Sequence, residues 1–329
     1  MEQLLAAGAP WPAAVAVSGG GDSIALMHLL AGWAKATGRA PPHVVTVDHG
    51  LRKESAADTR KVTAWAKRAG LTSNALRWKS PRPKSDIEAA AREARYRLMG
   101  EHARKNKLTA LYVGHTRDDQ AETFLLRLMR GSGLDGLAAM RAFAPYPLAG
   151  FRDLCIVRPL LGLEREVVRE HLRANDHDWL DDPMNEEDRF ARVRLRQLLP
   201  QLEQAGISRA RIASAATHLT RAREALEMVT AAVLSRAVRR VGNTLHVDSA
   251  ALTSAPREVG LRALAQLLMI VSGQSYRPRF ERLERLFDRI GTTEIGRGVT
   301  LHGCKIATAP SRKGVFGAGT LVIAREFES

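Results

Sequence analysis

The first half of the chain alternates short apolar runs with longer stretches whose apolar and polar positions recur at helical spacing. The apolar runs are rich in small and β-branched residues and are predicted as strands at residues 13–17, 44–47, 73–78, 110–113 and 155–157. The stretches between them are predicted as helices at residues 23–35, 55–69, 85–107 and 118–129. Continuous apolar strands separated by helices are typical of βαβ units around a parallel sheet. We therefore expect an α/β fold whose ligands bind at the carboxyl ends of the strands.

The second half of the chain changes character from about Leu163 onward. Helices are predicted there at residues 164–174, 193–202 and 208–240. After Gly242, two more helices (257–271 and 278–290) accompany short strands at residues 244–247, 299–301, 305–307 and 320–324. We therefore expect three parts: an N-terminal parallel-sheet domain at 1–202, a basic helical linker at 203–242 and a small α+β domain at 243–329.

Composition adds a class of partner to this outline. With 329 residues and 45% apolar content, the chain can form about two domains with buried cores. Its formal net charge of +15 points to a polyanionic partner such as nucleic acid. The segment from Arg189 to Arg240 holds eleven arginines and three glutamates. The two cysteines, Cys155 and Cys304, exclude a disulfide framework and a four-thiolate metal site, and we expect both to be structural.

The distribution of apolar residues also bears on cellular location. No apolar run approaches the roughly 20 residues of a membrane-spanning helix. Residues 4–17 are apolar, but Pro10 and Pro12 interrupt them and no basic residue precedes them, unlike a secretory signal. We therefore expect a cytoplasmic protein with no membrane partner.

A glycine-rich loop follows the first predicted strand and opens the first predicted helix. Its sequence is Ser18-Gly19-Gly20-Gly21-Asp22-Ser23. Glycines let backbone N–H groups approach an anion closely, and a helix N-terminus adds partial positive charge, so a phosphate group is the natural ligand. A Walker A loop would need a lysine after its last glycine, and a dinucleotide fingerprint would need a glycine in place of Ile24. The alternative is a plain strand–turn–helix corner that Asp22 or Ser23 caps.

Charged residues follow the second strand and line the third helix. Asp48 ends the second strand and faces the same crevice as the glycine loop. Arg92 and Arg95 are three positions apart and share a helix face, which suits contact with phosphate or another polyanion. The alternative is a solvated face in which Glu88 and Glu93 pair with these arginines.

A polar cluster follows the fourth strand and opens another helix. It contains His115, Asp118 and Asp119. One interpretation is that either aspartate caps the helix. The other is that their oxygens contact Mg²⁺ or a substrate amine, and that His115 handles a proton.

Together these motifs resemble one family. The sequence Ser-Gly-Gly-x-Asp-Ser after a strand is similar to the pyrophosphate-binding loop of the N-type ATP pyrophosphatases, the PP-loop family. Over about residues 13–202 the order of motifs resembles that of the tRNA(Ile)-lysidine synthetases: DHGLR at 48–52, AREARY at 91–96, GHTRDDQAET at 114–123, RGSGLDGL at 130–137, RPLL at 158–161 and DPMN at 182–185. Thr116 and Val193 depart from that pattern, where the family often has histidine and asparagine.

The resemblance implies an adenine nucleotide alpha hydrolase-like catalytic domain and a ligase. Members of the family join L-lysine to the wobble cytidine of the CAU anticodon of isoleucine tRNA. ATP adenylates the cytidine with release of pyrophosphate, and lysine then displaces AMP. The segment 243–329 resembles the family only loosely, and we expect it to be a tRNA-binding appendage.

The resemblance also assigns expected roles to residues. ATP is expected on Ser18, Gly19, Gly20, Gly21, Asp22 and Ser23. Catalytic, lysine or cytidine contacts are expected from Asp48, Arg92, Arg95, His115, Asp118, Asp119, Asp182, Asn185, Arg192 and Arg196. Mg²⁺ is expected on the ATP phosphates with Asp22 or Asp48. A homodimer is left open.

Three competing functions are weaker. A tRNA thiolase needs catalytic cysteines or an iron–sulfur cluster, and the chain has no CxxC pair. An amidotransferase-type synthetase needs a cysteine nucleophile for its glutaminase. A basic RNA-binding module without catalysis fits the composition, but carboxylates in the predicted crevice would oppose polyanion binding unless chemistry or a metal requires them.

Overall fold

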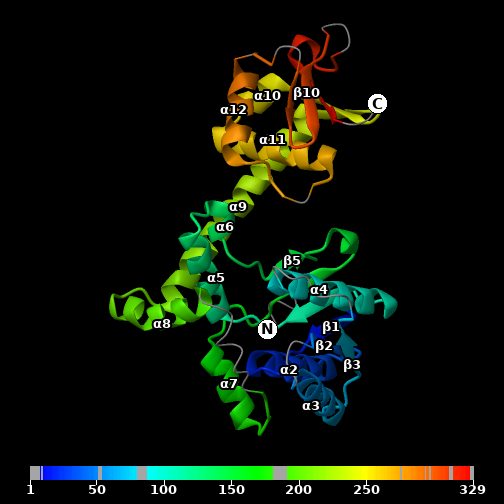
Figure 1. Ribbon diagram of the computed structural model, residues 1–329, viewed down its shortest axis with the longest axis vertical. Helices are drawn as coiled ribbons and strands as arrows, with labels where there is room; N and C mark the ends of the chain where they lie inside the picture. Colours follow the sequence, from blue (N-terminus) through cyan, green and yellow to red (C-terminus); the bar gives the residue numbers. More distant parts are fainter. Residues whose placement is uncertain are drawn as a thin grey trace. The chain divides into compact units, whose positions relative to one another are not determined.

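The structure is a computed structural model that describes residues 8, 10–50, 54–79, 87–180, 191–274, 276–292, 294–295, 298–310 and 314–326 (Figure 1). The chain forms two compact units, Met1–Thr220 and Arg221–Ser329. The boundary between them falls inside one helix, α9 (Arg209–Ala237). The expected three-part division of the chain stays a prediction.

A six-stranded sheet forms the centre of the first unit. Its strand order is β3-β2-β1-β4-β6-β5, and every neighbouring pair is parallel except β5 with β6. The strands are β1 (Ala13–Ala16), β2 (His43–Asp48), β3 (Ser73–Arg77), β4 (Ala110–Val113), β5 (Phe143–Pro145) and β6 (Cys155–Val157). After β1 the chain adds β2 and β3 on one side of it and then adds β4 on its other side. The direction in which strands are added therefore reverses between β1 and β4. A crevice for a ligand is expected at that point, on the carboxyl edge of the sheet.

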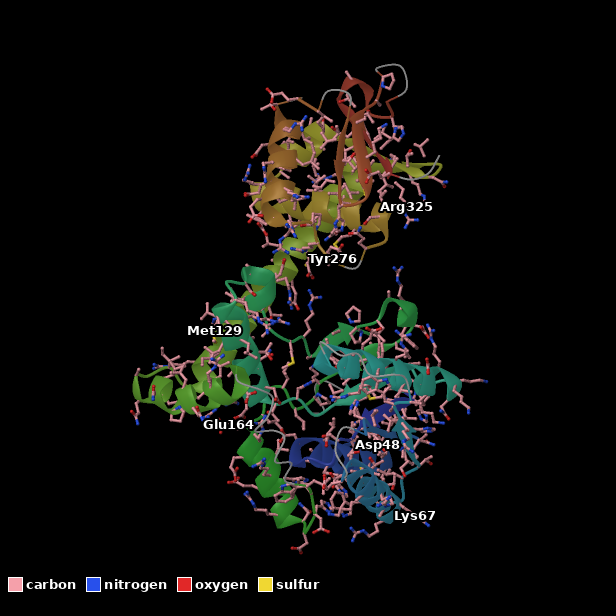
Figure 2. The ribbon with its side chains drawn as sticks, in the orientation of Figure 1. Asp48, Lys67, Met129, Glu164, Tyr276 and Arg325 are labelled. Carbon is pink, nitrogen blue, oxygen red and sulfur yellow. The ribbon has the colours of Figure 1, made fainter. Side chains whose placement is uncertain are left out.

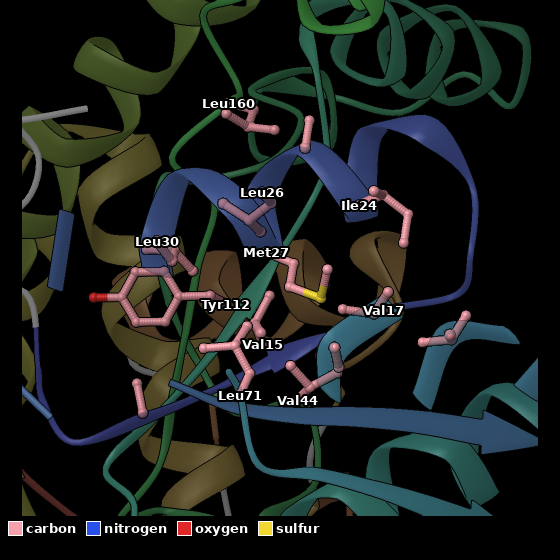
Figure 3. Packing of buried hydrophobic residues seen from close by; sticks show 14 of the residues in the cluster. Val15, Val17, Ile24, Leu26, Met27, Leu30, Val44, Leu71, Tyr112 and Leu160 are labelled. Carbon is pink, nitrogen blue, oxygen red and sulfur yellow. The ribbon is translucent and has the colours of Figure 1, made fainter. Parts of the chain in front are cut away.

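Helices cover both faces of this sheet, as the apolar strands require. The helices α2 (Gly21–Ala36), α3 (Ser55–Arg68) and α7 (Arg165–Ala174) share one core, in which Val15 and Tyr112 of the sheet contact Ile24, Leu26 and other apolar residues (Figure 3). The helix α4 (Ile87–Lys105) shares the core of the opposite face, where Tyr96 and Met99 pack. Successive strand residues alternate between the two cores, as the pleat dictates. The expected α/β parallel-sheet fold is therefore confirmed.

The remaining helices of the first unit pack beside the sheet. They are α5 (Arg117–Met129), α6 (Leu134–Leu137) and α8 (Ala191–Gln204), with the first part of α9. Ala121 of α5, Leu199 of α8 and Ile212 of α9 form a small buried cluster. This cluster fixes α5, which begins after the end of β4 and carries Asp118 and Asp119.

The second unit is a small α+β domain. Its antiparallel sheet has the order β7-β8-β11-β10-β9, formed by β7 (Val238–Val241), β8 (Thr244–Asp248), β9 (Val299–Leu301), β10 (Cys304–Thr308) and β11 (Thr320–Arg325). The helices are α10 (Ser249–Thr253), α11 (Arg257–Ser272) and α12 (Phe280–Gly291). Leu264, Phe287 and Ile323 are among the residues of the core that joins helices to sheet.

The structure corrects three details of the expected elements. The long helix predicted to reach Arg240 ends at Ala237, because the next four residues pair with β8 across a turn in which Gly242 has φ +57°. The short antiparallel strand β5 was not predicted, since three residues ending in Pro145 carry no alternation pattern. The helices α6 and α10 were also missed, because four and five residues are too few for a periodic pattern.

No helix in the described part of the chain is both long enough and apolar enough to span a membrane.

Candidate active site

The glycine loop, residues 18–23, joins the carboxyl end of β1 to the first turn of α2. Gly20 precedes the helix as its N-cap, and Gly19 has φ +99°, a conformation that side chains rarely adopt. A Cβ atom on Gly19 would lie 2.5 Å from Cδ1 of Leu180, whose backbone N–H donates to the Gly19 carbonyl at 2.9 Å. The loop therefore requires glycine there.

The two serines of the glycine loop bond inward and hold its shape. The Ser23 hydroxyl donates to the Gly20 carbonyl at 2.8 Å and accepts from the Ser18 backbone N–H at 3.2 Å. The two hydroxyl oxygens lie 3.3 Å apart. The Ser23 backbone N–H donates to the Gly20 carbonyl at 3.0 Å, and the N–H groups of Gly21 and Asp22 precede it in the first turn of α2. Such N–H groups and the helix dipole favour an anion here.

The carboxyl end of β4 packs directly against the start of α2. A Cβ atom on Gly114 would lie 2.8 Å from the Asp22 carbonyl oxygen, so only glycine lets the two backbones approach this closely. The contact brings the residues after β4 next to the glycine loop. It explains why a glycine precedes His115.

The start of α5 is held by its own carboxylates. Oδ2 of Asp119 accepts from the backbone N–H and the hydroxyl of Thr116, at 2.7 and 3.0 Å. Oδ2 of Asp118 accepts from the backbone N–H of Arg165 at 2.8 Å, and its Oδ1 lies 3.5 Å from Nε of Arg209. Asp119 therefore forms a capping box with Thr116 at the start of α5, as one interpretation of the sequence expects, whereas Asp118 accepts from the first backbone N–H of α7.

One arginine that the motifs did not single out joins the loop to α5. Arg165, the first residue of α7, donates from Nε to Oδ2 of Asp22 and from Nη2 to Oδ1 of Asp119, each at 3.0 Å. Its Nη1 lies 3.9 Å from Oε1 of Glu122, a carboxylate with only 3% of its side chain exposed. Three carboxylates thus share this guanidinium. We call Arg165, Asp22, Asp119 and Glu122 the acidic cluster.

Burial sets the electrostatics of the acidic cluster. Burial raises the pKa of Asp22, and the charge of nearby Asp119 adds to the increase, while Arg165 opposes both. The same carboxylates raise the pKa of Arg165 against the effect of its own burial. Oδ1 of Asp22 is buried and has no hydrogen-bond partner among the described residues. A buried carboxylate oxygen without a donor is a position where a cation would be favourable.

Asp48 ends β2 at the same edge of the sheet (Figure 2). Its Oδ1 accepts from the Ser55 hydroxyl at 2.6 Å and from the Gly50 backbone N–H at 2.8 Å. Hydrogen bonding by Ser55 holds the pKa of Asp48 below its usual value, with Gly50 and Arg77 adding to the effect against burial. The carboxylate is therefore charged, and it ties the end of β2 to Ser55, the first residue of α3.

The arginines of α4 meet the ends of β2 and β6. Nε of Arg95 donates to Nε2 of His49 at 3.1 Å, and burial together with this charge lowers the pKa of His49 to about 4. Arg92 lies over the ring of Tyr96, with 5.1 Å from Cζ to the ring centroid. Its charge also lowers the pKa of the buried Arg158, after the larger effect of burial. The expected basic face of α4 thus reaches the sheet edge.

His115 is held from the end of β6. Arg158 donates from Nε to Nδ1 of His115 at 3.2 Å and from Nη1 to the Arg141 carbonyl at 2.8 Å. In the sequence, Arg158 is the first residue of the RPLL motif, and the motif alone does not indicate a contact with His115. A sequence pattern could have indicated Arg165, since Arg165 and Arg169 are four positions apart at the start of a predicted helix. That pattern is not specific, because charged helix faces are common on a basic chain.

Some expected site residues lie outside the described residues. Asp182 and Asn185 fall in the segment 181–190, and the side chains of Arg192 and Arg196 are also outside the description. Val193 is in the same position. Within the described residues, no group of three or more histidines, cysteines, aspartates and glutamates is arranged to hold a metal ion by itself. The roles assigned to all these residues stay predictions.

Comparison with known proteins defines the class to which this site belongs. Residues 2–202, which make up more than half of the chain, match the family described as the PP-loop domain. The fold is also similar to that of the U34-tRNA thiolase NcsA from Methanococcus maripaludis, solved with its [4Fe-4S] cluster. The TM-score is 0.51 at 16% sequence identity, covering 65% of this chain and 71% of that one. The chain is therefore a PP-loop protein.

Curated relatives identify the family within that class. The chain is 40% identical over 265 residues to the tRNA(Ile)-lysidine synthase of Ruegeria pomeroyi, covering 80% of this chain and 62% of that protein. It is 37% identical over 336 residues to the protein of the same name from Rhodopseudomonas palustris, covering 93% and 94%. The chain belongs to the tRNA(Ile)-lysidine synthase family. It spans less than two thirds of the Ruegeria relative and nearly all of the Rhodopseudomonas relative.

Proposed function

We propose that this protein uses ATP to join L-lysine to the wobble cytidine of the CAU anticodon of isoleucine tRNA, forming lysidine. Membership of the tRNA(Ile)-lysidine synthase family supports the reaction class. The glycine loop at the start of α2 supports ATP binding. The formal charge of +15 supports a tRNA substrate.

The observation that carries the proposal is the acidic cluster beside the glycine loop. Three carboxylates at a nucleotide-binding edge would repel ATP and tRNA unless a positive charge joins them. Arg165 supplies one positive charge to Asp22, Asp119 and Glu122. Free lysine brings a further cation, the ammonium group of its side chain. A substrate amine therefore suits this site, whereas a purely RNA-binding module would have no use for it.

The proposed reaction has two steps, adenylation of the cytidine and displacement of AMP by lysine. First, the carbonyl oxygen at position 2 of the cytosine attacks the α-phosphorus of ATP, and pyrophosphate leaves with the electrons of the broken P–O bond. Second, the neutral side-chain amine of lysine attacks carbon 2, and AMP leaves with the electrons of the C–O bond. The attacking nitrogen loses protons, which a nearby carboxylate can accept. Asp119 and Glu122 of the acidic cluster are the candidates.

The expected Mg²⁺ fits one atom of this site. Oδ1 of Asp22 is buried, lacks a donor among the described residues and lies on the first turn of α2. One carboxylate together with ATP phosphates is a common arrangement for Mg²⁺. When bound, the ion would neutralise charge on the departing pyrophosphate. Asp48 suits this role less, because Ser55 and Gly50 already donate to its Oδ1.

The other expected residues divide between the two substrates. We propose that residues 18–23 bind the ATP phosphates. Arg92, Arg95 and His115 would contact the cytidine and its phosphate, since a guanidinium can stack on a base as well as pair with phosphate. Asp182, Asn185, Arg192 and Arg196 would complete the far wall. A cytoplasmic location and a homodimer stay predictions.

The test is lysine incorporation into a defined tRNA. Unmodified isoleucine tRNA with the CAU anticodon is incubated with ATP, Mg²⁺ and labelled lysine, and labelled tRNA, AMP and pyrophosphate are quantified. We expect one AMP and one pyrophosphate for each lysine attached. The Asp119→Asn variant should lose incorporation. The Asp153→Asn variant, which changes an aspartate paired with Arg104 on the surface, should retain it.

Two results would overturn the proposal. Binding of tRNA without pyrophosphate release would indicate the non-catalytic RNA-binding module. Pyrophosphate release with a different acceptor, and no lysine on the tRNA, would retain the ATP chemistry and reject the lysine assignment.

A further inference from the structure

Arg165 lies where three helices of the first unit begin. Its backbone N–H donates to Asp118 of α5, and its guanidinium binds Asp22 of α2 and Asp119 of α5. Arg165 is itself the first residue of α7, directly after Glu164 (Figure 2). One side chain therefore connects the ATP loop to the carboxylates assigned to the amine.

The contacts of Arg165 with Asp22 and with Asp119 use different nitrogen donors of its planar guanidinium. Nε binds Asp22 and Nη2 binds Asp119, and the guanidinium plane fixes the relative direction of these donors. Thr116 occupies the other oxygen of Asp119, so this carboxylate is held from both sides. A displacement of the guanidinium toward Asp22 consequently weakens its contact with Asp119 and with Glu122.

ATP binding supplies a reason for such a displacement. ATP remains anionic even with Mg²⁺ bound, and it would lie on the glycine loop beside Asp22. Its phosphates compete with Asp119 and Glu122 for the positive charge of Arg165. When Arg165 interacts less with these two carboxylates, their negative charge is less neutralised. They then attract another cation more strongly, and the ammonium group of the lysine substrate is such a cation.

We propose that Arg165 is a positioning residue that couples ATP binding to lysine binding. In the absence of ATP it neutralises Asp119 and Glu122 and thereby competes with lysine. When ATP occupies the glycine loop, the guanidinium shifts toward the loop and its contacts with Asp119 and Glu122 weaken. Lysine then binds these carboxylates more tightly. By linkage, lysine tightens ATP binding by the same factor. The inference rests on the proposed function for the identity of the amine.

The first test measures coupling rather than activity. Lysine affinity is determined by calorimetry with and without Mg²⁺ and an ATP analogue whose α–β bridge is methylene. For the unaltered protein we expect the analogue to lower the Kd for lysine by about fivefold or more. In Arg165→Met the ratio of the two Kd values should fall to about one. Arg165→Lys keeps a charge without the planar fork and should retain part of the ratio.

A matched control is available on the same helix. Arg173 of α7 pairs with Glu166 at 2.7 Å. Arg173→Met removes an arginine and an ion pair from α7, and its coupling ratio should equal that of the unaltered protein. An equal ratio in Arg165→Met, or a ratio of one in the unaltered protein, would overturn the proposal. If Arg165→Met does not fold, Arg165→Lys decides, and an unchanged ratio there counts against the proposal.

A second test separates this inference from the proposed function because it needs no lysine. Amide hydrogen exchange is measured over residues 117–122, the first part of α5, with and without the ATP analogue. We expect the analogue to change exchange there in the unaltered protein and not in Arg165→Met. If this response is present while no lysine is incorporated into tRNA, the function fails and the link through Arg165 stands. If lysine is incorporated but neither response depends on Arg165, the inference alone fails.

Discussion

Arg158 donates a hydrogen bond from Nε to Nδ1 of His115 across the ends of β6 and β4, at 3.2 Å. A guanidinium has no acceptor, so Nδ1 must supply its lone pair. In the neutral ring the proton is therefore on Nε2. The neutral His115 ring is therefore a donor at Nε2, in a single tautomer that Arg158 selects.

This relationship predicts that Arg158 matters without touching substrate. Arg158→Met should release the His115 ring and lower kcat for lysine incorporation by about 10- to 100-fold, because a small misplacement of a positioned group can cost that much. Arg104→Met removes a surface arginine paired with Asp153 and should lower kcat less than twofold. Equal kcat values for the two variants would show that the tautomer of His115 has no role.

The shape of the glycine loop predicts that alanine has opposite effects at Gly19 of the loop and at Gly32 of α2. Gly19→Ala would place a methyl group 2.5 Å from Leu180 at φ +99°, so ATP affinity should fall by about tenfold or more. Gly32→Ala on α2 has nothing within 4 Å of the new methyl group and should raise the free energy of unfolding by about 0.5–1 kcal/mol. Titration with ATP and denaturant unfolding check both. Retained ATP affinity in Gly19→Ala would mean that Leu180 yields and the loop tolerates Cβ.

Much of the fold was predictable because most of the parallel strands are short, apolar and bounded by charged or glycine residues. Val44 and Tyr112 belong to such runs, and both are buried in the sheet. The antiparallel strand ending at Pro145 was not predictable, because its position depends on pairing with β6 and not on its own pattern. The end of α9 likewise depends on β8 drawing Val238 into a hairpin.

The site was predictable as a set of strand ends, but not as a network. Asp22, Asp48, His115 and Asp119 follow strands of one parallel sheet, so sequence order alone brings them to one edge. Arg165 comes from a helix more than forty residues after Asp119, and nothing in its local sequence says which carboxylates it meets. Tertiary packing of α7 on α2 decides that contact.

Asp48 and Ser55 form a pair whose separate contributions can be measured. Ser55 donates at 2.6 Å to a carboxylate whose pKa this bond lowers. If Asp48 only ties the end of β2 to the start of α3, Ser55→Ala and Asp48→Asn should reduce incorporation similarly. We expect instead that Asp48→Asn reduces it by about 100-fold or more, as for loss of a charge-stabilising group. Ser55→Ala should reduce it less than tenfold and cost about 1 kcal/mol of unfolding free energy.

The measurements for this pair are lysine incorporation and denaturant unfolding of the two single variants and the double variant. A double variant no worse than Asp48→Asn would show that Ser55 acts through Asp48. Indistinguishable activities of the two single variants would show that Asp48 acts only by tying β2 to α3 through Ser55.

The imidazoles of His28 and His177 are stacked with centroids 3.6 Å apart and planes at 6°. Burial lowers the pKa of His28 from 6.5 to about 4, and the neighbouring His177 and His171 add to the effect. Between these two pH values the unfolded chain binds a proton that the folded chain excludes, so folding stability decreases as pH falls through this window. The stability associated with His28 is fully present above pH 6.5 and is lost as the pH approaches 4.

Replacing His28 should therefore flatten the dependence of stability on pH. Denaturant unfolding of His28→Gln at several pH values between 4.5 and 7 should give a shallower slope than the unaltered protein. The slope should not vanish, because burial also lowers the pKa of His49 to about 4. His218→Gln removes an exposed imidazole of α9 and should keep the original slope. An unchanged slope in His28→Gln would mean that the stacked pair takes up its proton without opening the contact between α2 and the segment after α7.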